Sequence, residues 1–206
     1  MCHNSDMTSA AEQIPGQRER NKEEARTRIL DAVIALMADG LSEVNHDAVA
    51  ERTGISRRTI YRYFVDRREL LAGASDRVRE LAGKGVAFPK SEQELLDTRS
   101  IYMGFDRIAP IATLVRSTPY GRAMRLAQKA ERQAAYTAAV ADAVKALPKG
   151  DRLLATAMLQ VLHTTPWLEM RDHWDLNGAQ IGRATAWAIR TLLADLRSRA
   201  GTPLDR

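Results

Sequence analysis

The stretch HDAVAERTGISRRTIYRYFVDRRELL, residues 46–71, decides how the fold of this chain is interpreted. Two short helical segments flank Gly54, a residue type that adopts positive φ at no steric cost. Ala50 stands four residues earlier, where a small side chain lets a second helix cross the first. The apolar residues at the positions that hold such a pair together are Val49, Ile55 and Ile60. This spacing predicts a helix-turn-helix.

The second helix of the pair has an apolar side and a basic side. Around a helical wheel centred on Ile60, Arg58 and Arg62 point away from the expected core. Between Arg52 and Arg68 the chain carries six arginines and one acid, Asp66. Guanidinium groups presented this way can reach guanine O6 and N7 and phosphate oxygens. The segment is therefore predicted to bind double-stranded DNA; the alternative is a plain helical hairpin with a solvated arginine face.

Composition restricts the class of protein. The chain has 206 residues, of which 45% are hydrophobic, and a formal net charge of +5. The one cysteine, Cys2, allows no disulfide within the chain and no cysteine-based metal site. The first twenty residues lack the apolar region of a signal peptide, and no apolar run reaches membrane-spanning length. A cytoplasmic protein without a membrane partner is expected.

The remaining pattern is helical throughout and predicts an all-α fold. Residues 1–20 are expected to form a flexible tail, residues 21–68 a three-helix DNA-binding domain, and residues 69–206 a helical ligand-binding and dimerisation domain. Asn45, Ser56 and Asp66 suit helix N-caps. The later helices are expected near residues 91–103, 105–115, 119–147, 151–171 and 178–199.

Two segments resemble the DNA-binding region of the tetracycline-repressor (TetR) family of transcriptional regulators. They are TRILDAVIALMADG, which ends at Gly40, and AVAERTGISRRTIYRYFVDRRELL, residues 48–71. The match as a whole covers about 50 residues, whereas the rest of the chain matches the family only in length and helical character. The resemblance implies a homodimeric repressor that a small-molecule inducer releases from a pseudo-palindromic operator. The inducer's identity stays open.

The resemblance also implies which residues contact DNA. Four match positions that face bases, three match positions that grip phosphates, and two match the start of the second helix, close to the DNA backbone. For both tyrosines, packing inside the domain is the alternative. In that order the residues are Arg57, Arg58, Thr59 and Arg62, then Tyr61, Tyr63 and Arg67, then Asn45 and His46.

The last two long helices carry an apolar arc wider than one core contact needs. The resemblance implies that they join two subunits in a four-helix bundle, and the alternative is that they form internal core only. The residues predicted for this interface are Leu154, Met158, Val161, Ile181, Thr185, Ala188, Leu192 and Leu196.

Between these regions the resemblance implies a ligand cavity. Methionine and aromatic side chains suit an adaptable apolar pocket, although plain core is the alternative for each of them, and for His163 in particular. A second basic run, Arg116, Arg122, Arg125, Lys129 and Arg132, is interpreted as a solvated helix face, with an anionic inducer as the alternative. The predicted pocket residues are Tyr102, Met103, Phe105, Met124, Tyr136, His163 and Trp167.

The two alternative functions are an enzyme and a DNA-binding or protein-interaction module without a ligand. The four histidines show no metal-ligand spacing, and no phosphate-binding or nucleophile motif occurs, so no catalytic residue, metal or cofactor is expected. The other class is a DNA-binding architectural or protein-interaction module without a small-molecule ligand. Saturable stabilisation by a small molecule would separate a ligand sensor from such a module.

Arg58 departs from the family pattern, which has a small residue at this position. We predict that the operator half-site has a guanine facing Arg58, because a guanidinium can donate two hydrogen bonds to guanine O6 and N7. Arg58→Ala is expected to weaken operator binding and to remove the preference for guanine there, as measured by binding to base-substituted operators. Undiminished affinity with an unchanged base preference would contradict this.

Overall fold

A computed structural model describes residues 16–40, 44–83 and 86–206. These residues form helices joined by short connections, and no strand occurs among them. The helices are α1 (Gln17–Ala38), α2 (His46–Thr53), α3 (Arg57–Tyr63), α4 (Arg67–Ala82), α5 (Glu92–Leu96), α6 (Thr98–Arg107), α7 (Ala109–Ser117), α8 (Pro119–Ala127), α9 (Lys129–Ala139), α10 (Ala141–Val144), α11 (Lys149–Thr164), α12 (Trp167–Trp174) and α13 (Gly178–Ser198). The predicted all-α fold is confirmed.

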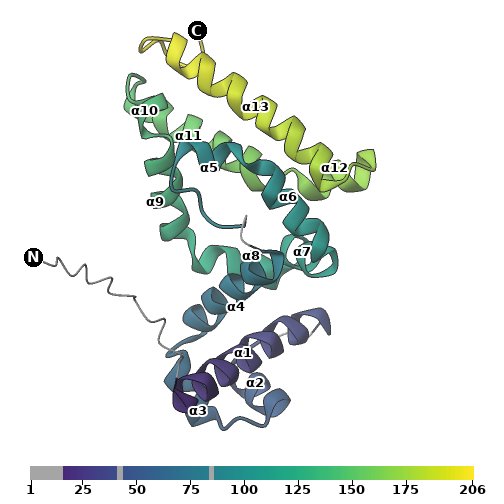
Figure 1. The fold of residues 1–206 in the computed structure, drawn as a ribbon. Helices are drawn as coiled ribbons and strands as arrows, with labels where there is room; N and C mark the ends of the chain where they lie inside the picture. Colours follow the sequence, from purple (N-terminus) through teal and green to yellow (C-terminus); the bar gives the residue numbers. More distant parts are fainter. Residues whose placement is uncertain (1–15, 41–43, 84–85) are drawn as a thin grey trace, which may run out of the picture.

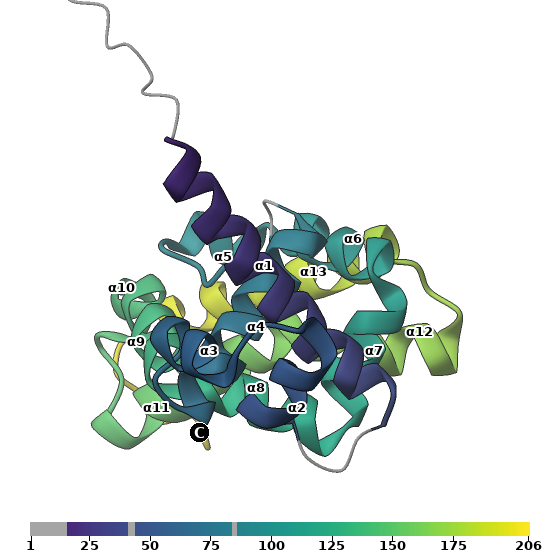
Figure 2. The same cartoon turned by 90° about the horizontal axis from the view of Figure 1, so that it is seen from below.

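Helices α1–α3 gather at one end of the molecule, and the remaining helices form a larger body at the other end (Figure 1). Seen from below, α1 crosses α4, with α2 and α3 beside it (Figure 2). Helix α4 runs from the small end into the larger body and packs against both α1 and α8. Among the described residues, no helix is both long and apolar enough to span a membrane.

The N-terminal boundary differs from the expected flexible tail of residues 1–20. Helix α1 begins at Gln17, so the last four residues of that range are helical, while residues 1–15 lie outside the described part. The Gln17 amide donates to Asn21 at 2.8 Å, and Arg20 donates to Gln17 at 2.7 Å. Side-chain contacts one helical turn apart stabilise this polar first turn. Because the turn has no apolar face, the apolar periodicity of the sequence did not indicate it.

Four of the five helices expected after residue 90 are divided, and the expected helix 105–115 breaks at Ile108 between α6 and α7. The expected helix 119–147 comprises α8, α9 and α10, with breaks at Gln128 and Val140. Gln128 is buried, and its side chain bonds across to Asp76 at 2.8 Å. A tertiary contact therefore favours the break there. Helix 151–171 ends at Thr164 because Pro166 lacks the N–H that would continue the ladder. The expected helix 91–103 divides at Asp97, whose carboxylate accepts from the Ser100 N–H at 3.3 Å and starts α6.

Helices α6 and α13 make the most extensive helix–helix contact of the larger body. Glycines permit this approach: a Cβ on Gly182 would lie 2.5 Å from the Arg99 Cα atom. The Thr98 hydroxyl donates to the Gly182 carbonyl at 2.7 Å. Asp106 fixes the end of the pair, because its carboxylate accepts from the Trp167 indole at 2.8 Å and from the Gly178 N–H at 2.6 Å. These bonds tie α6, α12 and α13 together.

The buried apolar residues form two clusters. The larger one runs without a break from α1–α4 into α6–α8 and reaches Trp167 and Ile181. The smaller one lies between α9–α11 and the second half of α13. Because Leu70, Ala74 and Val78 of α4 all belong to the larger cluster, the end formed by α1–α3 and the larger body share one core.

His163 lies in this interior, 1% exposed, and its Nδ1 atom lies 2.6 Å from the Tyr136 hydroxyl. Burial lowers the pKa of His163 to about 4. At neutral pH the ring is therefore uncharged, and Nδ1 can accept a hydrogen bond from the Tyr136 hydroxyl. The unfolded chain binds a proton on this ring near pH 6.5, whereas the folded chain does not until pH falls to about 4.

We predict that His163 makes folding less stable as pH falls from 6.5 toward 4. Between pH 7 and pH 5 its contribution is a loss of about 2 kcal/mol in the free energy of unfolding, because the unfolded state gains the proton first. In urea unfolding, the His163→Gln variant is expected to lose about 2 kcal/mol less stability between pH 7 and pH 5 than the native chain loses. Parallel curves for the two proteins across this window would contradict the prediction.

Candidate nucleic-acid interface and adjoining cavity

The predicted helix-turn-helix is formed by α2 and α3. The Asn45 side chain accepts hydrogen bonds from the backbone N–H groups of Asp47 and Ala48, each at 3.0 Å, and so caps α2. Gly54 ends α2 in the left-handed region at φ 69°. The Ser56 hydroxyl accepts from the Thr59 N–H at 3.3 Å and begins α3. The three local features expected from the sequence therefore set the turn.

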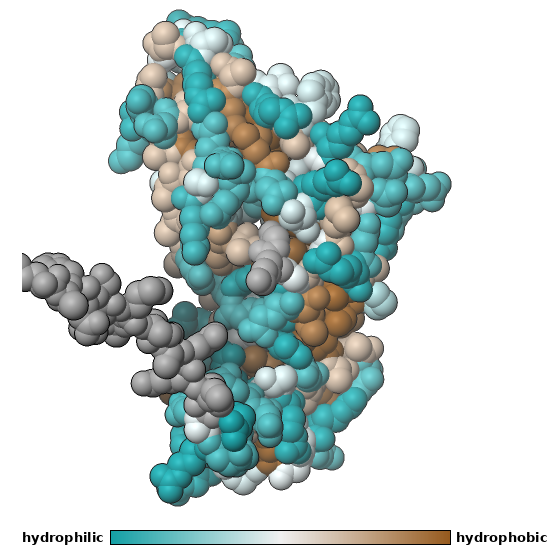
Figure 3. Space-filling model, viewed as in Figure 1, coloured by the Kyte–Doolittle hydropathy of each residue, from teal (hydrophilic) through white to brown (hydrophobic). Residues whose placement is uncertain are grey.

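Helix α3 has the two faces that its sequence predicts. Ile60 is fully buried, and Val49 of α2 is buried against the same core. Arg58 and Arg62 are exposed on the other side. On the face drawn in Figure 3, hydrophilic residues cover most of the end that carries α1–α3. The exposed side of α3 therefore offers guanidinium groups to solvent rather than to the protein's own body.

His46 lies inside this end of the molecule rather than on its surface. It is 4% exposed, and its ring stacks on Tyr61 with centroids 4.1 Å apart and planes 5° apart. Its Nε2 atom lies 2.8 Å from the Phe64 carbonyl oxygen at the end of α3. The sequence suggested a residue close to DNA, but the geometry makes His46 a support that holds Tyr61 and the end of α3.

Arg57 lies at the junction of the two helices. Its Nε atom forms an ion pair with Asp47 at 2.8 Å, and its guanidinium lies 5.7 Å from the centre of the Tyr61 ring. A hydrogen bond with Tyr61 and the charge of Asp47 raise the pKa of Arg57. Tyr61 keeps 41% of its surface exposed. Arg57 and Tyr61 thus form one exposed group on the surface of α3.

The other predicted contact residues are divided between surface and support. Tyr63 is half-buried, with the Arg62 guanidinium 5.8 Å from its ring centre. Arg67, the first residue of α4, is exposed and donates from Nε to the Val44 carbonyl at 3.2 Å. Thr59 is half-buried, with its hydroxyl 2.9 Å from that of Ser56.

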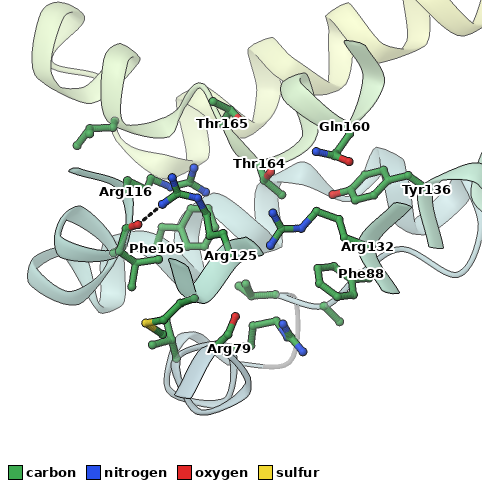
Figure 4. A pocket seen from close by; sticks show the side chains of 18 of the residues that line it. Arg79, Phe88, Phe105, Arg116, Arg125, Arg132, Tyr136, Gln160, Thr164 and Thr165 are labelled. Atoms are coloured by element: carbon green, nitrogen blue, oxygen red, sulfur yellow. Dashed lines mark hydrogen bonds between the residues drawn. The ribbon is translucent and has the colours of Figure 1, made fainter. Parts of the chain in front are cut away.

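A cavity of about 400 Å³ lies in the larger body, beside α4. Figure 4 shows Arg116, Arg125 and Arg132 reaching into the same space, with Gln160 and Thr164 on a neighbouring wall. The lining residues are Ser75, Val78, Arg79, Val86, Ala87, Phe88, Phe105, Ala112, Val115, Arg116, Met124, Arg125, Arg132, Tyr136, Gln160, Thr164, Thr165, Leu168 and Glu169.

Of the seven predicted pocket residues, Phe105, Met124 and Tyr136 line this cavity. The other four do not. Met103 is 40% exposed at the surface. Three are fully buried core side chains with hydrogen-bond partners: Tyr102 donates to the Leu162 carbonyl at 2.7 Å, Trp167 donates to Asp106, and His163 bonds Tyr136.

Four arginines also line the cavity, three of them from the second basic run. The interpretation of that run as a solvated face holds for Arg122 and Lys129, which are exposed. It is wrong for Arg116, Arg125 and Arg132, which are half-buried around one space. These three come from α7, α8 and α9, so no single helical period joins them, and the sequence carries no local sign of their convergence.

Burial, reinforced by the neighbouring arginine charges, lowers the pKa of all three residues, that of Arg116 to about 10. They remain charged at neutral pH. Within the described part of the chain, no group of three metal-ligating side chains occurs that could hold a metal ion.

Comparison with known proteins supports the assignment of the N-terminal end. Residues 29–74 match the model of the bacterial regulatory proteins of the tetR family. The crystal structure of a candidate transcriptional regulator from Pseudomonas aeruginosa PAO1 shares 16% sequence identity, covering 87% of this chain and 95% of that one, with a TM-score of 0.49. No curated protein matches the chain.

The matched segment includes the last ten residues of α1, all of α2 and α3, and the first half of α4. A helix-turn-helix with an exposed arginine face, within this match, defines a DNA-binding transcriptional regulator. This segment, residues 29–74, is similar to the DNA-binding region of the tetR family.

We predict that Gly54→Ala lowers the free energy of unfolding by about 1 kcal/mol, because alanine is disfavoured in the left-handed region. An added Cβ at Gly54 would meet nothing within 4 Å, so the cost is conformational rather than steric. Gly150→Ala is the matched control: this glycine also has open space around it, lies in the first turn of α11, and lacks positive φ. Urea unfolding at fixed protein concentration measures both, and equal stability of the two variants would refute the prediction.

Proposed function

We propose that this protein is a ligand-responsive repressor that binds a pseudo-palindromic operator as a homodimer and leaves it when a small molecule binds in the cavity. The observation that carries the proposal is the position of α4. Its first residue, Arg67, lies beside the helix-turn-helix, whereas Ser75, Val78 and Arg79 line the cavity. One helix therefore connects the proposed ligand site with the proposed DNA reader.

In this proposal the exposed side of α3 enters the major groove. Arg57, Arg58 and Arg62 would contact base edges, while Tyr61 and Arg67 would contact phosphates. Tyr63 would add a phosphate contact, Asn45 and Thr59 would lie close to the DNA at the starts of their helices, and His46 would hold Tyr61 in place. Operator affinity is then expected to fall steeply with salt, because each neutralised phosphate releases counterions.

Helices α11 and α13 present the surface proposed for dimerisation. Leu154 is 60% exposed and Met158 is 52% exposed, which is unusual for side chains of this size and supports a partner surface. The other large apolar side chains exposed on these two helices are Leu153, Val161 and Trp187.

The stripe predicted on α13 needs a correction. Ile181, Thr185 and Leu196 are buried in the subunit's own core, because α13 uses this side against α6, α10 and α11. Ala188 and Leu192 are half-buried at its edge. The proposed interface therefore rests on α11 and on the Trp187 side of α13.

Ligand response requires the ligand to prefer the conformation that does not bind DNA. Helix α4 suits such coupling because it lies in the core shared by both ends of the molecule. A displacement of its cavity end would be transmitted to Arg67 and would change the separation of the two α3 helices in a dimer. A ligand that bound the DNA-binding and the non-binding conformations equally well would leave operator binding unaltered.

Selection of bound sequences from random DNA tests the proposal. The expected product is a pair of inverted half-sites whose centres lie one or more helical turns apart, about 34–36 Å per turn. Met158→Glu, which places a charge on the proposed interface, is expected to shift the protein toward monomer in sedimentation and to weaken operator binding about tenfold or more.

Ala138→Glu is the control, since Ala138 is exposed on α9, a helix that the proposed interface does not include. It is expected to leave both measurements unchanged. Unpaired half-sites, or a Met158→Glu protein that remains a dimer with full operator affinity, would count against the homodimer. Operator binding that no small molecule alters would favour an architectural module instead.

A further inference from the structure

The cavity combines positive charge with an apolar wall. Arg116, Arg125 and Arg132 reach into it from three different helices. On the apolar side, the lining residues are Val78, Phe105, Ala112, Val115, Met124 and Leu168. A volume of about 400 Å³ is within the range that suits a small organic molecule and exceeds what one inorganic anion fills.

The three arginines lack a carboxylate partner inside the described part of the protein. Arg116 lies over the Phe105 ring, 4.7 Å from its centre, and Arg132 lies over Phe88 at 5.3 Å. Arg125 donates to the Val115 carbonyl. No ion pair of these three with any described acid occurs.

The nearby acids are engaged elsewhere. Asp76 pairs with the fourth lining arginine, Arg79, and also accepts from Gln128 at 2.8 Å. Glu169, the one lining carboxylate, points to His173 at 3.3 Å. The charge of Glu131 acts on Arg132 without an ion pair between them, and no described carboxylate pairs directly with Arg116, Arg125 or Arg132. The cavity therefore keeps an excess of positive charge.

Charges that are withdrawn from water without a counter-charge destabilise a fold. Their mutual repulsion adds to this cost, and burial lowers the pKa of each guanidinium without discharging it at neutral pH. An anion in the cavity would offset both effects. Guanidinium groups also match carboxylate and phosphate oxygens in geometry, and these hydrogen bonds are strengthened by charge.

We propose that the cavity binds an amphipathic organic anion, with a carboxylate or phosphate head held by Arg116, Arg125 and Arg132 and an apolar tail against Phe105, Met124 and Leu168. This inference rests on the proposed function, since it names the chemical class of the ligand. It also assigns to these arginines a recognition role rather than a structural one.

Octanoate, octyl phosphate and the neutral octanamide are the test ligands, because they share a tail and differ in the head group. At constant ionic strength, we expect octanoate or octyl phosphate to raise the Tm of the full-length protein, and octanamide to leave it unchanged. The acid that binds more tightly in isothermal titration identifies the head group. Equal stabilisation by octanamide, or none by either acid, overturns the proposal.

Arg116→Met and Arg125→Met keep an apolar side chain and remove the charge. Each is expected to weaken binding of the effective acid about tenfold or more, since a charge-assisted contact is lost. Each is also expected to raise the Tm of the ligand-free protein, an effect that loss of a structural contact would not produce. Arg122→Met is the matched control, because Arg122 lies on α8 with Arg125 but is exposed.

Unweakened binding by both variants overturns the assignment of the arginines. Titration of the operator complex with the same ligands separates this proposal from the proposed function. Binding of an acid that leaves operator affinity unchanged keeps the anion site and contradicts the ligand response. Release of the operator by octanamide keeps the ligand response and contradicts the anion site.

Discussion

The structure depends on the burial of α4 by two sets of neighbours at once. Leu70, Leu71 and Ala74 pack with α1, and Val78 and Ala82 continue into the larger body. The approach is close at Gly73, where a Cβ would lie 2.7 Å from the Phe64 ring. Because interiors are close-packed, a displacement of α4 at one end would require its neighbours at the other end to repack. Helix α1 also contacts α7, but α4 has the larger contacts with both ends.

Local features of the sequence predicted the N-terminal end well. Asn45, Gly54 and Ser56 act through their immediate neighbours, so their roles follow from residue type and spacing. The position of His46 did not follow, because its burial depends on stacking with Tyr61 fifteen residues later. A helical wheel predicts the burial of a side chain well where one helix alone forms its surroundings. It predicts burial less well where two helices form them.

The larger body shows the same limit more strongly. Gln128 breaks a helix in favour of a bond to Asp76, more than fifty residues away in the chain. Trp167 and Tyr102 have the residue types of a ligand pocket, yet their polar atoms are satisfied inside the core. Conversely, Arg116 and Arg132 have the residue type of a surface and lie around a cavity. Residue type alone does not distinguish these environments, because the folding of α7–α9 around one space creates them.

The Asp106 carboxylate that holds α6, α12 and α13 together has a consequence for spectroscopy. It binds the indole of Trp167, which is fully buried beside Phe105 and Arg171, whereas Trp174 and Trp187 are largely open to water. In a single subunit the chain therefore contains one shielded tryptophan and two that a dissolved quencher can reach, and a dimer formed through the Trp187 side of α13 would shield Trp187 as well. In the monomeric protein, emission that survives the quencher comes from Trp167 and reports the state of this junction without any attached label.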